Sequence, residues 1–327
     1  MSKKIRDAIV VIMAPVILYF FFLILRPASF GKFNTIYIII TQSFITCMIA
    51  WGMQYLAKMG EFDMSLGAEM ILDSIIAALL CAKMGFAGII FGCLAVAVIC
   101  GIIKGILFKI MGIPVMIMTI ALVYLMGAIG GLITNSAAVT IASKYTFLGR
   151  APGNVVIFIL AGILMYILAN RSVYGAHVNA AAGSAHISAN NGIDVQSIKI
   201  KSLMISSLFA GIAAIVQLSH GSGVTPSVGL DSIQNIMEPL MSVFIGFVMA
   251  QYVNIVGAIF AASIMMSIIS NGITALNWSS AIYNVVVGAV LILIMAYMSL
   301  ARIYSVKRAE KNGALANIKE VEMATQK

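Results

Sequence analysis

Long apolar runs recur along the 327-residue chain, with short polar segments between them. Each run approaches the roughly 20 mostly apolar residues that an α-helix needs to cross a bilayer. The pattern predicts ten membrane-spanning helices, at residues 8–25, 36–57, 68–82, 86–108, 113–133, 153–169, 202–218, 236–250, 254–273 and 281–300. The third and eighth runs are short and interrupted by polar residues, which leaves eight full spans as the alternative.

Composition agrees with a membrane protein and argues against a soluble one. Hydrophobic residues make up 62% of the chain and charged residues only 9%, whereas soluble domains have about 45–50% apolar and about 25% charged residues. The expected fold class is all-α: a polytopic membrane protein of about ten transmembrane helices with a short cytoplasmic helix. We expect a single transmembrane domain over residues 1–300 and a basic cytoplasmic tail over residues 301–327.

The net charge of +9 reflects orientation in a membrane rather than binding to nucleic acid. Basic residues gather before the first apolar run, after the last one and in alternate loops, as cytoplasmic segments do in membrane proteins. Both termini are therefore expected in the cytoplasm. The segments expected inside hold Lys58, Lys104, Lys109, Arg171, Lys199 and Lys201. Those expected outside hold only Arg26, Lys32, Lys83, Lys144 and Arg150.

Two inward-facing segments are more than simple turns. The first, residues 58–67, places Glu61 and Asp63 among glycines between two apolar runs. Irregular backbone at membrane depth is tolerated only where protein or water satisfies it, so we expect a packed re-entrant segment. The second, residues 170–201, has an alanine-rich middle at 180–189 that favours one short helix. Gly192 then supplies a helix stop, and Asp194 lies where it would cap the next helix.

The chain carries no motif for catalysis. It lacks the GxxxxGK[ST] loop that binds nucleotide phosphates. Three histidines fall in predicted loops on two different sides: His177, His186 and His220. Four cysteines lie inside apolar runs, where core packing is the expected role: Cys47, Cys81, Cys93 and Cys100. We therefore expect no enzyme activity, no cofactor and no metal, and a protein that moves or senses a solute.

Several short motifs occur in a recognisable order. Residues 60–67 read G-E-F-D-M-S-L-G, and Ile113-Pro114 opens a span that contains Thr119. Gly175 and a run ending at 183–184 precede N-G-I-D-V at 191–195, and an Asn-Gly pair at 271–272 lies near the ninth span. This order resembles the permease subunits of ribose, xylose, arabinose and related sugar ABC importers. The family signature G-G-I-D-L-S-V-G matches at Gly60, Asp63, Ser65 and Gly67.

The resemblance implies a bacterial cell-membrane permease with three kinds of partner. These are a cytoplasmic ABC ATPase, an extracytoplasmic solute-binding protein and a second permease copy, in a homo- or heterodimer. It also implies that the short cytoplasmic helix couples to the ATPase through Ala180, Ala181, Ala182, Gly183, Ser184 and Ala185. The family has Arg, Gly and Glu at the positions of Ala176, Ala182 and Ala185, and such departures would suit one half of a heterodimer.

Carboxylates within the apolar runs are the candidates for solute contact. Glu69 and Asp73 are four residues apart, hence on one helix face, and Glu238 begins another span. Charges inside a span cost at least a few kcal/mol and usually face a partner or a cavity. They either pair with nearby lysines or line a translocation path made by Glu69, Asp73 and Glu238. We favour pairing for Asp73 and the path for Glu69, and expect Asp63 or Ser65 to cap the helix that follows.

Two other functions remain open from the sequence. An ion-coupled secondary carrier is the alternative, and a membrane receptor without transport is a third possibility. A secondary carrier has no need of a cytoplasmic helix that fits a motor subunit, and usually shows broken helices in repeated halves. The helix expected at 180–189 therefore favours a transporter driven by a separate ATPase.

Overall fold

The computed structural model describes residues 3–278, apart from 222 and 228, and scattered residues between 282 and 296. Within this described part every element is a helix, and an isolated backbone bridge joins Val139 to Val224. The elements are α1 (Lys3–Leu25), α2 (Pro27–Phe30), α3 (Phe33–Lys58), α4 (Leu66–Met84), α5 (Phe86–Met111), α6 (Val115–Thr134), η1 (Ser143–Gly149), α7 (Gly153–Asn170), α8 (Val173–Gly183), α9 (Ala185–Asn190), α10 (Val195–Ser219), η2 (Asp231–Ile233), α11 (Gln234–Met249) and α12 (Ile255–Ala275).

Seven stretches of helix in the described residues are long and apolar enough to cross a membrane. They are α3, α5, α6, the η1–α7 stretch, α10, the η2–α11 stretch and α12. The first nine predicted runs each coincide with a helix, but α1 has a shorter apolar part and α4 carries three charged residues. The tenth predicted span and the basic tail at 301–327 lie outside the continuously described residues. The all-α prediction is confirmed for the described part.

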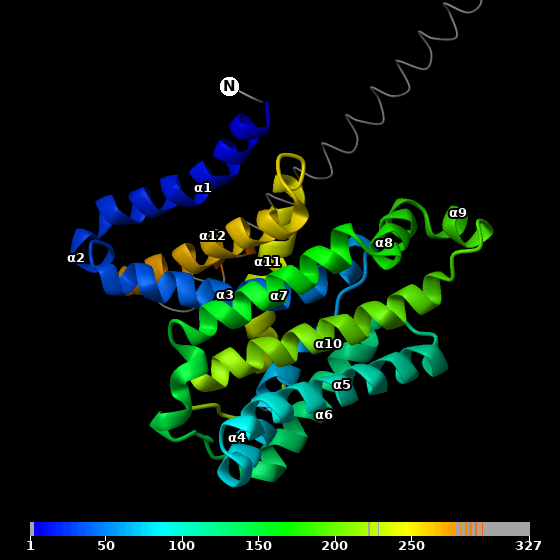
Figure 1. The fold of residues 1–327 in the computed structure, drawn as a ribbon, viewed down its shortest axis with the longest axis horizontal. Helices are drawn as coiled ribbons and strands as arrows, with labels where there is room; N and C mark the ends of the chain where they lie inside the picture. The colour runs from blue at the N-terminus through cyan, green and yellow to red at the C-terminus, as the bar shows by residue number, and fades with distance from the viewer. Residues whose placement is uncertain are drawn as a thin grey trace, which may run out of the picture. The chain divides into compact units, whose positions relative to one another are not determined.

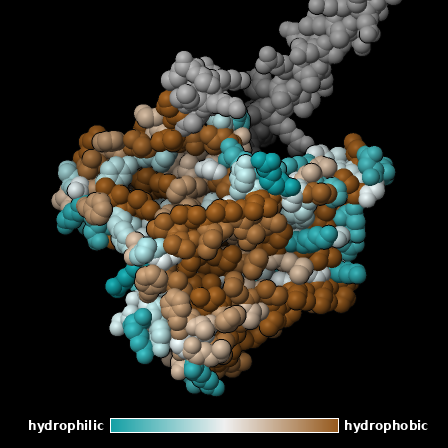
Figure 2. Space-filling model, in the orientation of Figure 1, coloured by the Kyte–Doolittle hydropathy of each residue, from teal (hydrophilic) through white to brown (hydrophobic). Residues whose placement is uncertain are grey.

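The surface shows how these helices suit a bilayer. Hydrophobic side chains form a broad band across the helices in Figure 2, and hydrophilic ones gather toward their ends. In Figure 1, α8 and α9 lie at one end of α7, and η1 lies at its other end. The bundle is thus an apolar layer with polar segments at both ends.

Glycines on α5 allow this helix to pack closely against two neighbours. A Cβ on Gly92 would lie 2.7 Å from the Cα of Ala77 on α4, which is too close for any side chain. One on Gly101 would lie 3.1 Å from the Cα of Met204 on α10. Small residues let helix backbones approach in membranes, where dispersion then holds them together. These two close approaches place α5 between α4 and α10.

The four cysteines also have the packing role expected of them. All are buried and none forms a disulfide: Cys47, Cys81, Cys93 and Cys100. Free cysteine behaves as a small apolar residue in such positions.

The segment between α7 and α10 differs from the single helix expected at 180–189. It forms two helices, α8 and α9, which are separated at Ser184. Ser184 has extended backbone angles, and its hydroxyl accepts a hydrogen bond from the backbone N–H of Ile187. Serine favours such an N-cap position, and the preceding Gly183 weakens a helix interior. The predicted stop at Gly192 (φ +82°) and the Asp194 cap on Ser197 (3.0 Å) are confirmed.

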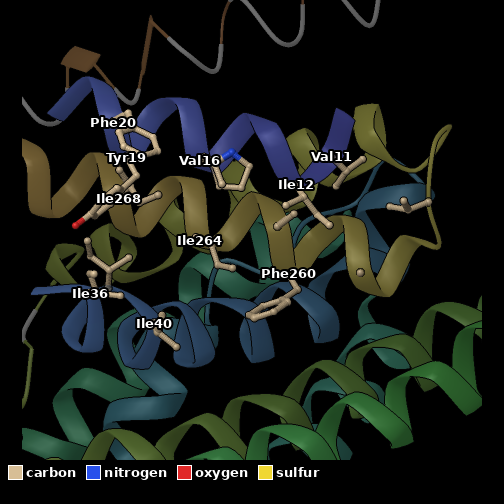
Figure 3. Close-up of a pocket in the computed structure, with 15 residues that line it drawn as sticks. Val11, Ile12, Val16, Tyr19, Phe20, Ile36, Ile40, Phe260, Ile264 and Ile268 are labelled. Atoms are coloured by element: carbon tan, nitrogen blue, oxygen red, sulfur yellow. The ribbon is translucent and has the colours of Figure 1, made fainter. Parts of the chain in front are cut away.

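An aromatic cluster joins the N-terminal helices to α12. Phe22, Phe30 and Ile268 are buried together, and the Phe22 and Phe30 rings stack with centroids 5.5 Å apart. Beside this cluster, α1, α3 and α12 enclose a pocket of about 600 Å³ (Figure 3). The labelled side chains that surround it are all apolar except for Tyr19. Such a lining does not suit a solute rich in hydroxyl groups.

Candidate functional site

The signature segment between α3 and α4 is organised around the carboxylate of Asp63. Its Oδ1 accepts hydrogen bonds from the backbone N–H (2.9 Å) and the hydroxyl (2.6 Å) of Ser65, where α4 begins. Its Oδ2 accepts from Lys104 Nζ on α5 (2.8 Å) and from Ser206 Oγ on α10 (3.3 Å). Asp63 is fully buried. Ser65 is the N-cap residue of α4, and no side chain caps the first N–H groups of this helix, so the predicted side-chain cap is wrong. The carboxylate of Asp63 instead joins the segment before α4 to α5 and α10.

Lys104 provides the buried positive charge of this site. Its position within the helix predicted at residues 86–108 is confirmed. Lys104 lies inside α5 with no exposed surface, where its ammonium bonds to Asp63 and to Glu69. An ammonium in the membrane needs a partner charge, and these carboxylates supply it. The sequence indicates this buried position, because Lys104 lies between Gly101 and Gly105 in an otherwise apolar part of the helix.

Glu69 and Asp73 lie on one face of α4, as their spacing predicted, but in different environments. Glu69 is paired with Lys104, and both side chains are fully buried. Asp73 is equally buried, and neither of its carboxylate oxygens has a hydrogen-bond partner among the described residues. Its Oδ2 lies 3.5 Å from where a Cβ on Gly211 of α10 would be. The pairing expected for Asp73 is therefore wrong, since Glu69 is the paired residue.

The rest of the signature segment is fixed by neighbouring helices. Glu61 pairs with Lys199 of α10 (Oε1 to Nζ, 2.6 Å) and accepts a hydrogen bond from the backbone N–H of Val115 (3.3 Å). The backbone N–H of Met64 donates to the hydroxyl of Thr119 on α6 (3.0 Å). The motif residues from two distant parts of the sequence are thus in contact. The segment is packed against protein, as its irregular backbone requires.

Two positions of the signature segment require glycine, each for a different physical reason. Gly60 has a φ of +76°, in the left-handed region that side chains disfavour. A Cβ on Gly67 would overlap the carbonyl oxygen of Ser232, so glycine allows α4 to contact η2. Gly60 therefore permits the turn, and Gly67 permits the close packing of α4 against η2.

The segment expected to contact an ATPase is attached to the bundle through α8. Asn179 Oδ1 accepts a hydrogen bond from Lys58 Nζ at the end of α3 (2.9 Å). The Tyr174 hydroxyl lies 2.6 Å from Ser202 Oγ on α10. Of the six expected coupling residues, Ala181 is buried. The other five are exposed or half-exposed: Ala180, Ala182, Gly183, Ser184 and Ala185.

The remaining sequence candidates do not converge on one site. Glu238 is half-buried on α11. His177 lies on α8, His186 on α9, and His220 follows α10. Burial, and to a smaller extent the charge of Arg150, lower the pKa of His220. The described residues contain no group of three or more His, Cys, Asp or Glu side chains placed to hold a metal ion.

Comparison with known proteins shows the family to which this chain belongs. The chain matches the model of a family described as "Branched-chain amino acid transport system / permease component" over residues 35–295. The chain belongs to this family. It is therefore a multi-pass membrane permease component of a transport system and not an enzyme.

Curated relatives of this permease share low identity with it. The ribose import permease of Escherichia coli (strain K12) is 23% identical over 81% of this chain and 85% of the relative. The galactofuranose transporter permease of the same organism is 26% identical, and the match covers 54% of each protein. The fructose import permease of Rhizobium meliloti is 26% identical over 64% of this chain and 62% of the relative. No solved structure matches the chain.

Removing the ammonium of Lys104 should destabilise the permease strongly. In Lys104→Met, Asp63 and Glu69 lose the cation that compensates them, and breaking a buried pair in this way costs about 3–5 kcal/mol. Lys199→Met is the matched control, because its pair with Glu61 is partly exposed and such pairs contribute about 0–1 kcal/mol. We expect a much larger drop in the detergent melting temperature for Lys104→Met. Equal drops would contradict the central role of Lys104.

The two α4 carboxylates should respond differently to neutral substitution. Glu69→Gln weakens a buried ion pair, so its melting temperature should fall. Asp73→Asn removes no hydrogen bond and no ion pair seen in the structure, so its melting temperature should stay equal or rise. Thermal unfolding of the two purified variants, side by side, tests this order. A larger loss for Asp73→Asn would show that its carboxylate is paired in the membrane.

Proposed function

We propose that this chain is the permease subunit of a bacterial ABC importer for a sugar-like solute. A separate cytoplasmic ATPase would supply the energy, and an extracytoplasmic binding protein would deliver the solute. The family match over residues 35–295 carries the proposal. The ribose, galactofuranose and fructose permeases among the relatives support a sugar-like cargo. A second permease copy, identical or not, would complete the membrane part.

The contacts of α8 suggest how closure of an ATPase would reach the signature segment. A push on the exposed α8–α9 segment acts on α3 through Lys58 and on α10 through Tyr174 and Ser202. The same α10 helix bonds to the signature segment through Lys199 and Ser206. Motion of α10 would therefore shift both the outer ion pair and the buried site at Asp63.

This role also fixes a proposed orientation. An ATPase lies in the cytoplasm, so α8 and α9 would face inward and η1 outward. A ten-helix topology in the bacterial cell membrane, with both termini cytoplasmic, follows from that orientation and from the distribution of basic residues. In this topology Asp73 and Glu238 remain proposed path carboxylates, whereas the path role expected of Glu69 gives way to its ion pair with Lys104.

Energy dependence distinguishes this function from an ion-coupled secondary carrier. We expect uptake of a monosaccharide into vesicles to require ATP hydrolysis by the copurified ATPase. An ATPase variant without catalytic activity should abolish uptake, and an ionophore that collapses ion gradients should leave it unchanged. The reverse pattern would identify a secondary carrier.

The coupling role of α8–α9 can be tested at its exposed face. Ala185→Arg places a bulky charge where the ATPase should dock, so uptake and ATPase association should both fall severalfold with normal membrane insertion. Ala138→Arg is the matched control, because Ala138 is also exposed but follows α6 toward the other end of the bundle. Equal uptake in both variants would rule out docking at this face. Cross-linking from single cysteines at 180–185 to the ATPase gives an independent measurement.

A further inference from the structure

Between α10 and η2, the residues that the structure describes form no helix or strand. Near the start of this segment, the backbone of Val224 exchanges hydrogen bonds with Val139, which follows α6 (2.8 and 2.9 Å). Further on, Pro226 Cβ lies 3.6 Å from where a Cβ on Gly130 of α6 would be. The chain becomes helical again at Asp231, where η2 begins beside Gly67 of α4. The segment therefore runs along α6 from its end toward its interior.

The point where it meets α4 lies deep in the apolar layer. Gly67, which contacts Ser232, precedes Asp73 on α4 by about 9 Å along the helix axis. Asp73 lies beside Gly211, and Gly211 lies just beyond the middle of α10 toward its Ser219 end. Ser206 of α10 bonds to Asp63 before α4, and Ala214 further along α10 lies beside Ser74 further along α4, so the two helices run toward the same end. Ser232 therefore lies close to the level of the middle of α10. The hydrocarbon core extends about 15 Å to either side of its centre, so Ser232 is well inside it.

Polar side chains are exposed at this depth. Asp231, Gln234 and Asn235 are all exposed in the chain, at η2 and the first turn of α11. The hydroxyl of Ser232 between them is buried and has no hydrogen-bond partner among the described residues. Lipid cannot satisfy a carboxylate or two amides, and polar groups in membranes face water or protein. Non-helical backbone at this depth obeys the same rule.

We propose that Asp231, Gln234 and Asn235 line the aqueous translocation path and hydrogen-bond to the hydroxyl groups of the solute. This inference rests on the proposed transport function. The carboxylate accepts hydrogen bonds and each amide both donates and accepts, which suits a neutral polyhydroxylated solute. Glu238 follows one helical turn later on α11, so the path would continue along that face.

Accessibility to a hydrophilic reagent tests the path directly. The four native cysteines are buried, so single cysteines at 234 and 235 can be labelled in the otherwise unchanged transporter. The probe is a cationic methanethiosulfonate, which reacts with the thiolate that forms in water. Leu160→Cys on α7 is the control, an exposed apolar position. We expect Gln234→Cys and Asn235→Cys to react at least about tenfold faster, because apolar surroundings suppress the thiolate.

Two outcomes would overturn the path. Reaction no faster than at Leu160→Cys would place these residues away from water. A disulfide between two copies through Asn235→Cys, with protection from the reagent, would identify an interface between permeases instead.

Uptake tests the contact with solute. We expect Gln234→Ala and Asn235→Ala to lower the initial uptake rate of the transported monosaccharide severalfold at normal membrane abundance, with Leu160→Ala unchanged. Unchanged uptake in both would overturn the solute contact even if the path is wet. The labelling result does not depend on ATP, so it stands apart from a failure of the proposed energy source.

Discussion

The buried ion pairs of Lys104 hold the centre of this permease together. One ammonium on α5 bonds to Asp63, which precedes α4, and to Glu69 within α4. Asp63 in turn reaches Ser65 and Ser206. Because the interior of a membrane protein cannot solvate charge, each of these groups requires a partner of opposite charge or a hydrogen bond. The close packing of α5 against α4 and α10 brings them within bonding distance.

The same centre connects the parts that a transport cycle needs to move together. On one side, α10 carries the serine that bonds to Asp63 and the lysine that bonds to Glu61, and it contacts α8 through Tyr174. On the other side, Gly67 brings the start of α4 against η2. A displacement of α10 would therefore change contacts on both sides of the signature segment. Packed helices with few alternative arrangements transmit such shifts well.

Sequence reasoning predicted the helices better than the partners of the charges. Apolar length identified nine helices of the described part. It failed to assign the ion pair to Glu69 rather than Asp73, because their spacing on one helix face does not show which of them an ammonium on another helix reaches. It failed at Ser184 because alanine propensity on both sides hid a capping serine. The exposed residues at 231–235 were missed because their depth depends on the contact between Gly67 and Ser232.

The turn between α4 and α5 also constrains how the protein enters the bilayer during synthesis. A single residue, Gly85, with a φ of +62°, separates the two helices. Asp63 and Glu69 are made before Lys104, so the lysine emerges when its counter-charges are already present. The two helices can then insert as a hairpin in which Glu69 and Lys104 are already paired, at lower cost than a helix that carries either charge alone. Biogenesis, like the mature fold, would depend on that one lysine having its carboxylates beside it.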